Sequence, residues 1–181
     1  GEFAIVPADY LAPWPEGYSA TEACSVWMQY LTAYFALKTV GGLSRHMNVL
    51  ITAAASSARV GAIQMAKALG ATAIATTRSS DKEAFLKKVG ADHVIITRLG
   101  TDFAPEIRKL TDGRGVDVVF DPVSGEFTKD YMNGLNWGAR VIIYGMLNGL
   151  DINIPILPSI RSKASVHPYS MFNHVKFQEE L

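Results

Sequence analysis

The sequence predicts an α/β fold in which a doubly wound parallel sheet of six strands carries helices on both faces. Short apolar segments alternate along the chain with segments whose apolar residues recur at helical spacing. The stretch of roughly 30 residues that starts at Asn48 also reads as strand, helix and strand, the repeating unit of parallel sheets. In this architecture the strand order is 3-2-1-4-5-6, and a ligand lies above the carboxyl ends of the first and fourth strands.

The amino-terminal part of the chain is predicted to hold a short strand and a long helix. Residues 3–10 (FAIVPADY) read as the strand, and a loop interrupted by prolines follows. Ser19 or Thr21 can cap the helix, and Glu22 stands three residues after Ser19, as in a capping box. The apolar pattern continues to Leu37, and a glycine pair then ends the helix.

The other predicted elements alternate between strand and helix. Pro168 falls inside the last predicted strand, which we therefore place at an edge of the sheet, where proline is tolerated. Residues 152–155 read as a short extended piece. The predicted strands are 49–51, 72–77, 93–97, a strand from 116, 139–145 and 164–172; the predicted helices include 63–69, 81–89, one capped at 101 or 102 that ends at 110, and 127–137.

Charge and cysteine content exclude several classes of function. Seventeen basic and seventeen acidic residues cancel, so composition supports neither a nucleic-acid surface nor a polybasic membrane patch. The single cysteine, Cys24, cannot build a disulfide framework and fits a reducing compartment. No apolar run reaches the length of a membrane span and no signal peptide is visible. We therefore expect a cytoplasmic protein that binds a small molecule.

The turn after the first predicted strand of the central unit is a candidate phosphate-binding site. Pyrophosphate binding at such a turn needs small residues, free amide groups and the positive end of a helix dipole. Ser56, Ser57 and Ala58 supply small side chains and two hydroxyls. The segment is not a Gly-x-Gly-x-x-Gly motif, so an ordinary well-packed turn is the alternative interpretation.

A polar segment after the next strand indicates which dinucleotide would bind. In this architecture an acidic residue there accepts hydrogen bonds from a ribose 2′-hydroxyl, whereas an arginine accommodates a 2′-phosphate. Arg78, Ser79 and Lys82 occupy the segment, and a guanidinium with an ammonium suits a phosphate. The pattern favours NADP over NAD, although it is also typical of a solvated helix start.

Two loops after the fourth and fifth strands should lie where the nicotinamide end of a dinucleotide binds. They cover residues 121–125 and 144–148, and the second contains Tyr144, Gly145, Met146 and Leu147. Ordinary strand exits are the alternative interpretation. The four histidines are dispersed and no metal-binding or nucleophile motif occurs, so we expect no metal and assign no catalytic residue.

Five segments in order resemble the medium-chain dehydrogenase/reductase superfamily, and within it the zinc-independent quinone oxidoreductase-like branch. The similarity covers residues 1–173, and it implies a Rossmann-type fold. The segments are YLTAYFAL (30–37), VLITAAASS (49–57), IATTRSSDK (74–82), GADHVI (90–95) and VDVVFDPVSG (116–125).

The resemblance also implies a domain organisation. Residues 1–40 would be the end of a GroES-like catalytic domain with the linking helix, 41–175 the NADP-binding domain, and 176–181 the start of a segment that returns to the catalytic domain. We therefore expect a shortened piece of a longer enzyme, inactive alone. The outer strand at 164–172 resembles the one that pairs across the dimer in relatives, so we expect a homodimer.

Further roles follow from the resemblance. Thr32 would lie near the nicotinamide and Thr97 near the adenine. Met28 stands where zinc-dependent relatives carry a cysteine ligand, so no catalytic zinc is expected. Arg59 replaces a glycine of the phosphate turn: either it points outward and adds a cation near the phosphates, or the turn is remodelled and binds the cofactor less well.

The expected function is hydride transfer from NADPH to a quinone or an α,β-unsaturated carbonyl compound in a zinc-free reductase. Two alternatives remain open at this point. One is a zinc-dependent alcohol dehydrogenase of the same superfamily. The other is a non-catalytic NADP(H)-binding sensor or scaffold, which the exchange at Arg59 would favour.

Overall fold

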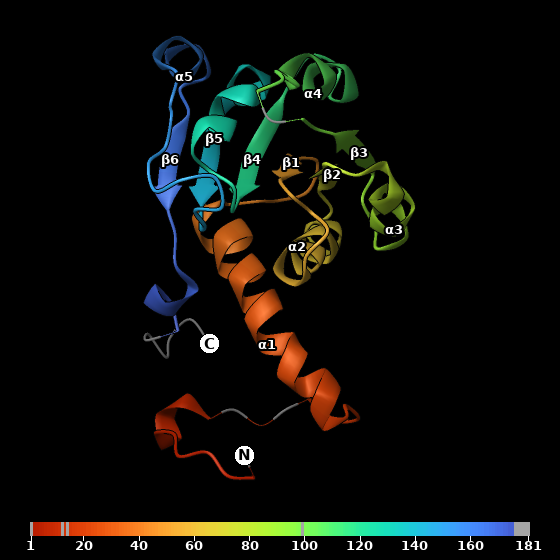
Figure 1. Cartoon of the computed structure of the whole chain (residues 1–181), viewed down its shortest axis with the longest axis vertical. Coiled ribbons are helices and arrows are strands. Elements are labelled where there is room, and N and C mark those ends of the chain that lie inside the picture. The colour runs from red at the N-terminus through yellow and green to blue at the C-terminus, as the bar shows by residue number, and fades with distance from the viewer. Residues whose placement is uncertain (1, 12, 14, 99, 176–181) are drawn as a thin grey trace.

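A parallel six-stranded sheet forms the centre of the computed structural model, which describes residues 2–11, 13, 15–98 and 100–175 (Figure 1). The strand order is β3-β2-β1-β4-β5-β6, and every neighbouring pair is parallel. The predicted Rossmann-type order is thereby confirmed. The strands are β1 (Asn48–Ile51), β2 (Thr72–Thr77), β3 (His93–Ile96), β4 (Val116–Asp121), β5 (Leu135–Ile143) and β6 (Ser165–Pro168).

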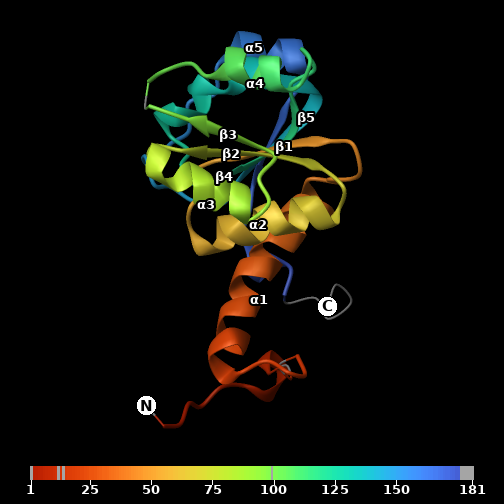
Figure 2. The same cartoon turned by 90° about the vertical axis from the view of Figure 1, so that its right-hand side faces the viewer.

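Helices cover both faces of the sheet, as predicted (Figure 2). Val49 and Ile51 of β1 point into an apolar core beneath the helices that precede β3, whereas Leu50 points into a second core beneath the later ones. Strand β1 is therefore buried on both faces, which explains its unbroken apolar sequence. The helices are α1 (Ala20–Tyr34), α2 (Ser57–Ala68), α3 (Glu83–Lys88), α4 (Ala104–Leu110) and α5 (Ile156–Ser162).

Helix α1 projects from the sheet domain and ends in an unusual turn (Figures 1 and 2). Its start is the predicted capping box, since Ser19 and Glu22 exchange both hydrogen bonds. After Tyr34 the chain continues as a π-helix, Phe35–Val40, whose side chains at 35–37 are buried against the sheet. The wider turn thus carries the helix from solvent into the domain.

Several predicted elements are wrong in type or extent. The strand expected at 3–10 is absent, and the chain there is extended until a 3₁₀ turn at Ala8–Tyr10. The helix expected at 127–137 is two 3₁₀ segments, Glu126–Asp130 and Met132–Gly134, after which β5 begins. Gly134 in the second segment packs closely on α4, since a Cβ there would stand 2.8 Å from the Ile107 side chain.

The last predicted strand is shorter than expected, and the short helix α5 had not been predicted before it. Strand β6 covers only Ser165–Pro168, and a 3₁₀ turn occupies Met171–Asn173. Pro168 does lie on the edge strand, as predicted. The extended piece expected at 152–155 makes one parallel bridge, between Ile152 and Gly125. Residues 176–181, expected to begin a return segment, lie outside the described residues.

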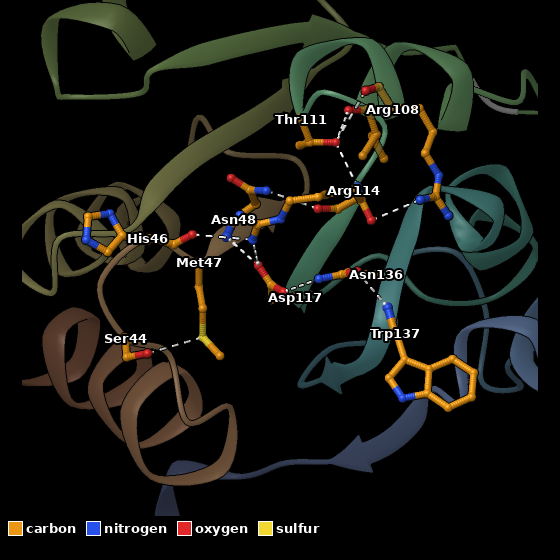
Figure 3. A network of polar contacts seen from close by, with 12 residues as sticks. Ser44, His46, Met47, Asn48, Arg108, Thr111, Arg114, Asp117, Asn136 and Trp137 are labelled. Atoms are coloured by element: carbon orange, nitrogen blue, oxygen red, sulfur yellow. Dashed lines mark hydrogen bonds and ion pairs between the residues drawn. The ribbon is translucent and has the colours of Figure 1, made fainter.

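A polar network ties together the amino ends of β1, β4 and β5 (Figure 3). The Asp117 carboxylate accepts hydrogen bonds from Asn48 N at 2.7 Å and from Asn136 Nδ2 at 2.7 Å, and it pairs with Arg114 at 3.4 Å. Arg108 donates to four backbone carbonyls in the neighbouring turns. The network closes the end of the sheet opposite to the predicted ligand site.

Candidate functional site

A cavity of about 450 Å³ opens at the carboxyl ends of the strands, where the fold predicts a ligand. It lies between the turn after β1, the segment after β2 and the loops after β4 and β5. Seven of the residues expected to bind a cofactor line it. The lining residues are Ala53, Ala55, Ser56, Arg59, Thr76, Thr77, Arg78, Ser79, Lys82, Thr97, Val123, Phe127, Leu147 and Asn148.

The turn after β1 forms one wall of the cavity and is held by β2. Ala53 N donates to Thr76 Oγ1 at 3.1 Å, and Ala54 N donates to the Thr76 carbonyl at 2.7 Å. These bonds hold Ala53 in a left-handed conformation with φ of 48°. Ser56 caps α2 without a side-chain capping bond, and its side chain faces the cavity.

Not every predicted residue of this turn reaches the cavity. Ser57 and Ala58 form the first turn of α2 but do not line it. Gly61 packs instead against helix α1, because a Cβ there would stand 3.1 Å from the Gln29 carbonyl oxygen. This glycine therefore serves the contact between two helices rather than the approach of a phosphate.

The segment after β2 brings two cations into the cavity. Arg78 follows the last residue of β2, and Ser79 and Lys82 complete the segment, with all three in the lining. Neither Arg78 nor Lys82 makes a salt bridge with any described residue. Thr97, at the end of β3, is buried and donates its N–H to the Thr77 carbonyl at 2.8 Å.

Arg59 also lines the cavity, half-buried in the first turn of α2. Its Nε is buried and lacks a well-formed hydrogen bond, as does the hydroxyl of Tyr144. The two side chains interact with each other, since Arg59 acts on the Tyr144 hydroxyl through its charge and a hydrogen bond. Burial raises the pKa of Tyr144, the nearby Arg59 guanidinium partly opposes this, and Asp121 adds to it. Arg59 thus adds a third cation to the cavity wall, and its place near the cofactor phosphates stays a prediction.

Asp121, the last residue of β4, holds the turn after β1 and the loop after β4 together through hydrogen bonds to its carboxylate. Its carboxylate is fully buried and accepts hydrogen bonds from Thr52 Oγ1 (2.7 Å), Val123 N (2.8 Å), Ser124 N (3.3 Å) and Tyr131 Oη (2.8 Å). Burial, followed by the charge of Asp121, raises the pKa of Tyr131 well above its ordinary value. The sequence carried one signal of this role, an aspartate that ends the otherwise apolar run VVFD.

The loops after β4 and β5 lie side by side, as expected. Leu147 N donates to the Pro122 carbonyl at 3.1 Å, and Asn148 N donates to the Val123 carbonyl at 2.9 Å. Gly145 is required there, since a Cβ would stand 2.6 Å from the Pro122 oxygen. Of the four residues expected from the second loop, only Leu147 lines the cavity; Tyr144, Gly145 and Met146 do not.

Thr32 lies apart from the cavity. Its hydroxyl donates to the Met28 carbonyl within α1, and its own carbonyl accepts from Tyr169 Oη at 3.1 Å. Met28 itself is exposed. The described residues contain no group of three histidine, cysteine or acidic side chains that could hold a metal ion. None of the helices in the described part combines the length and hydropathy that a bilayer crossing requires.

Comparison with known proteins identifies the family. The family model described as zinc-binding dehydrogenase matches residues 60–181, more than half of the chain. The chain belongs to the zinc-binding dehydrogenase family. A curated relative, a phenolphthiocerol/phthiocerol polyketide synthase of Mycobacterium tuberculosis, is 38% identical over 76% of this chain and 6% of its own length. Prostaglandin reductase-3 of Bos taurus is 34% identical over 87% of this chain and 41% of its own length.

Solved structures of mycobacterial proteins share the fold. A complex with NADPH has a TM-score of 0.88 at 26% identity, covering 97% of this chain and 54% of the other. A structure described as a quinone oxidoreductase has a TM-score of 0.85 at 26% identity, covering 92% of this chain and 51% of the other. The similarities confirm the medium-chain dehydrogenase/reductase superfamily and its quinone oxidoreductase-like branch. The chain spans about half the length of these structures.

Proposed function

We propose that this chain is the NADP(H)-binding part of a reductase that transfers hydride from NADPH to a quinone or an α,β-unsaturated carbonyl compound. One observation carries the proposal: Arg78 and Lys82 line the cavity at the end of β2, and none of the described lining residues carries a carboxylate. The similarity to a mycobacterial protein solved with NADPH and to prostaglandin reductase-3 supports it.

The residues of the cavity fit the cofactor. A 2′-phosphate needs a fork of donors and positive charge, which Arg78, Ser79 and Lys82 offer beside β2. The pyrophosphate needs small residues at a helix start, which Ala53, Ala55 and Ser56 provide. Thr97 would border the adenine. Ser57 and Ala58, in the first turn of α2, would offer backbone amides.

The loop after β5, with Tyr144, Gly145, Met146 and Leu147, would border the nicotinamide, and Thr32 of α1 would approach it from the side of the catalytic domain. Bound NADPH supplies the hydride. The chain would hold the ring in one orientation and exclude water through apolar residues such as Val123 and Phe127. Donors near the acceptor oxygen would stabilise the negative charge that develops there. We assign no catalytic acid to the chain.

We propose that the enzyme is free of catalytic zinc. Met28 stands where zinc-dependent relatives carry a cysteine ligand, and Cys24 lies one helical turn away on an exposed surface. Metal analysis of the purified chain tests this. Stoichiometric zinc would favour the zinc-dependent alcohol dehydrogenase instead.

We also propose a homodimer formed through the edge strand at 164–172, in the cytoplasm. Strand β6 is paired with β5 on one side only, so its other edge offers free backbone groups to a second copy. Size-exclusion chromatography with light scattering would detect the dimer.

Calorimetric titration tests cofactor choice. We expect the 181-residue chain to bind NADPH more tightly than NADH. Arg78→Gln should weaken NADPH binding by about tenfold or more, because a charged hydrogen bond to the phosphate is lost, and leave NADH binding almost unchanged. Arg45→Gln, an exposed arginine outside the cavity lining, is the matched control. Equal losses of NADPH and NADH affinity would show that Arg78 does not bind the 2′-phosphate. If the chain binds neither cofactor, the scaffold alternative is favoured.

A further inference from the structure

We propose that Tyr169 is a positioning residue, whose hydroxyl enters the backbone ladder of α1 and fixes both the direction of this helix and the place of Thr32. The inference rests on the proposed function and deepens it, because that function brings Thr32 to the nicotinamide. Tyr169 follows β6 and stands 137 positions after Thr32 in the chain. It links the edge of the sheet to the helix that projects from the domain.

The hydroxyl of Tyr169 contacts two backbone groups that lie one helical turn apart. Tyr169 Oη donates to the Thr32 carbonyl at 3.1 Å, and the backbone of Ala36 acts on the same hydroxyl through a hydrogen bond. In a regular α-helix the N–H of Ala36 would donate directly to the carbonyl of Thr32. The hydroxyl is therefore a partner for both groups of one step of the helical ladder.

The type of helix changes at the point where the hydroxyl enters. Helix α1 ends at Tyr34, and the π-helix begins at Phe35. The N–H of Gly41 then donates to the carbonyl of Ala36 at 2.7 Å, which is the longer spacing of a π-helix. A side chain that enters the ladder and a π-turn are both recognised causes of a change in helix direction. Both occur together here, at the base of the projecting helix.

The sheet holds the Tyr169 side chain in place. The N–H of Tyr169 donates to the Ile143 carbonyl at 2.8 Å, which ties its backbone to the end of β5. The tyrosine is buried, and its ring packs against the ring of His174 at a centroid distance of 5.6 Å. His174 stacks in turn on Phe35 at 5.1 Å. Since the hydroxyl is anchored to the sheet in this way, the path of α1 adapts to it.

Thr32 is held by two residues that follow β6. Its carbonyl accepts from Tyr169 Oη, and its hydroxyl, which donates to the Met28 carbonyl, also lies 3.6 Å from Met171 Sδ. Burial raises the pKa of Tyr169, and the hydrogen bond from the Ala36 backbone opposes this in part. The phenol therefore keeps its proton at neutral pH and remains a donor to Thr32. Loss of this donor would release Thr32 on its backbone side.

Pulsed electron paramagnetic resonance measures the direction of α1 in the 181-residue chain. Cys24 is the only cysteine of the chain and is exposed on α1, so it carries one spin label. Lys88→Cys, at the exposed end of α3, carries the second. Tyr169→Phe keeps the ring and removes the hydroxyl, and the distance between the labels should shift by about 1.5 Å or more, the rise of one helical residue. An unchanged distance would overturn the proposal.

Calorimetry tests the effect on Thr32 with two ligands, NADPH and adenosine 2′,5′-bisphosphate, which lacks the nicotinamide. Tyr169→Phe should weaken NADPH binding by about threefold to tenfold and leave the bisphosphate almost unchanged. A general loosening of the domain would instead weaken both ligands. Tyr34→Phe, the same exchange at an exposed position of α1, is the matched control and should change neither the label distance nor either affinity.

Two calorimetric results would overturn the role of Tyr169 in positioning Thr32. One is an unchanged NADPH affinity of Tyr169→Phe, and the other is an equal loss of affinity for NADPH and the bisphosphate. Failure of the proposed function looks different, because the unmodified chain would then bind neither ligand while the label distance still responds to Tyr169→Phe. Thermal unfolding of each variant checks that the domain remains folded.

Discussion

Thr52 Oγ1 donates a hydrogen bond of 2.7 Å to the carboxylate of Asp121, and both residues are fully buried. The bond joins the first residue after β1 to the last residue of β4, the two strands between which the order of the sheet reverses. It fixes the separation of the two loops that border the cavity.

Loss of the Asp121 carboxylate should destabilise the domain strongly. Asp121→Ala leaves four buried donors without an acceptor, so we expect the free energy of unfolding to fall by about 3 kcal/mol or more. Thr52→Val removes one donor and should cost about 1 kcal/mol, whereas Thr52→Ser keeps the hydroxyl and should cost less. Urea unfolding measures all three. Equal stability of Asp121→Ala and the unmodified chain would contradict this account.

The network at the opposite end of the sheet allows stability to be separated from binding. Asp117 accepts from Asn48 and Asn136 and pairs with Arg114, far along the strands from the cavity (Figure 3). Asp117→Ala should lower the free energy of unfolding by about 2 kcal/mol and leave NADPH affinity unchanged in calorimetry. A matching loss of affinity in the folded variant would show that the two ends of the sheet are coupled.

Two glycines of one turn should respond differently to a methyl group. Both have positive φ, 81° at Gly113 and 86° at Gly115. A Cβ at Gly113 meets nothing within 4 Å, whereas at Gly115 it would stand 2.4 Å from the Gly134 carbonyl oxygen. Gly113→Ala should cost about 1–2 kcal/mol from backbone strain alone. Gly115→Ala should cost clearly more in urea unfolding, and equal costs would mean that Gly134 moves away without penalty.

The strand order and the two-sided sheet could be predicted because they depend on patterns that run along the chain. The four residues of β1 are all buried, and their unbroken apolar run is the mark of a central parallel strand. The segment 127–137 misled prediction, because its apolar residues do recur at helical spacing. The structure instead starts β5 at Leu135 and packs Gly134 closely against Ile107 of α4, a tertiary contact that no local pattern contains.

The candidate site likewise contains features that the sequence predicts and features that depend on tertiary packing. The positions of Arg78 and Lys82 follow from strand order, so sequence reasoning brought them to the cavity. The interaction of Arg59 with Tyr144 joins the first turn of α2 to the loop after β5, a pairing that only the folded structure defines. The role of Asp121 depends on complete burial, since an exposed aspartate at the same position would bind water rather than four protein donors.

The ion pair between α2 and the start of β3 should make stability depend on acid pH. Burial alone would raise the pKa of Asp92, but the hydrogen bonds from Lys67 Nζ (2.6 Å) and Ala73 N (2.8 Å), with the Lys67 charge, lower it below its ordinary value. A lowered pKa means that the folded state binds the proton less readily than the unfolded state. The stabilisation is therefore complete above about pH 5 and is lost as pH falls below about 4.

Asp92→Asn isolates this contribution from the other carboxylates. Urea unfolding of the unmodified chain and the variant should show a stability difference at pH 7, which shrinks as the pH falls through the lowered folded-state pKa of Asp92, because Asp92 then becomes protonated in both states. Lys67→Met removes the partner of Asp92 and keeps the aliphatic stem. This variant should also have a lower free energy of unfolding at pH 7 than the unmodified chain. A difference that stays constant from pH 7 to pH 3 would show that the Asp92 charge contributes nothing to folding.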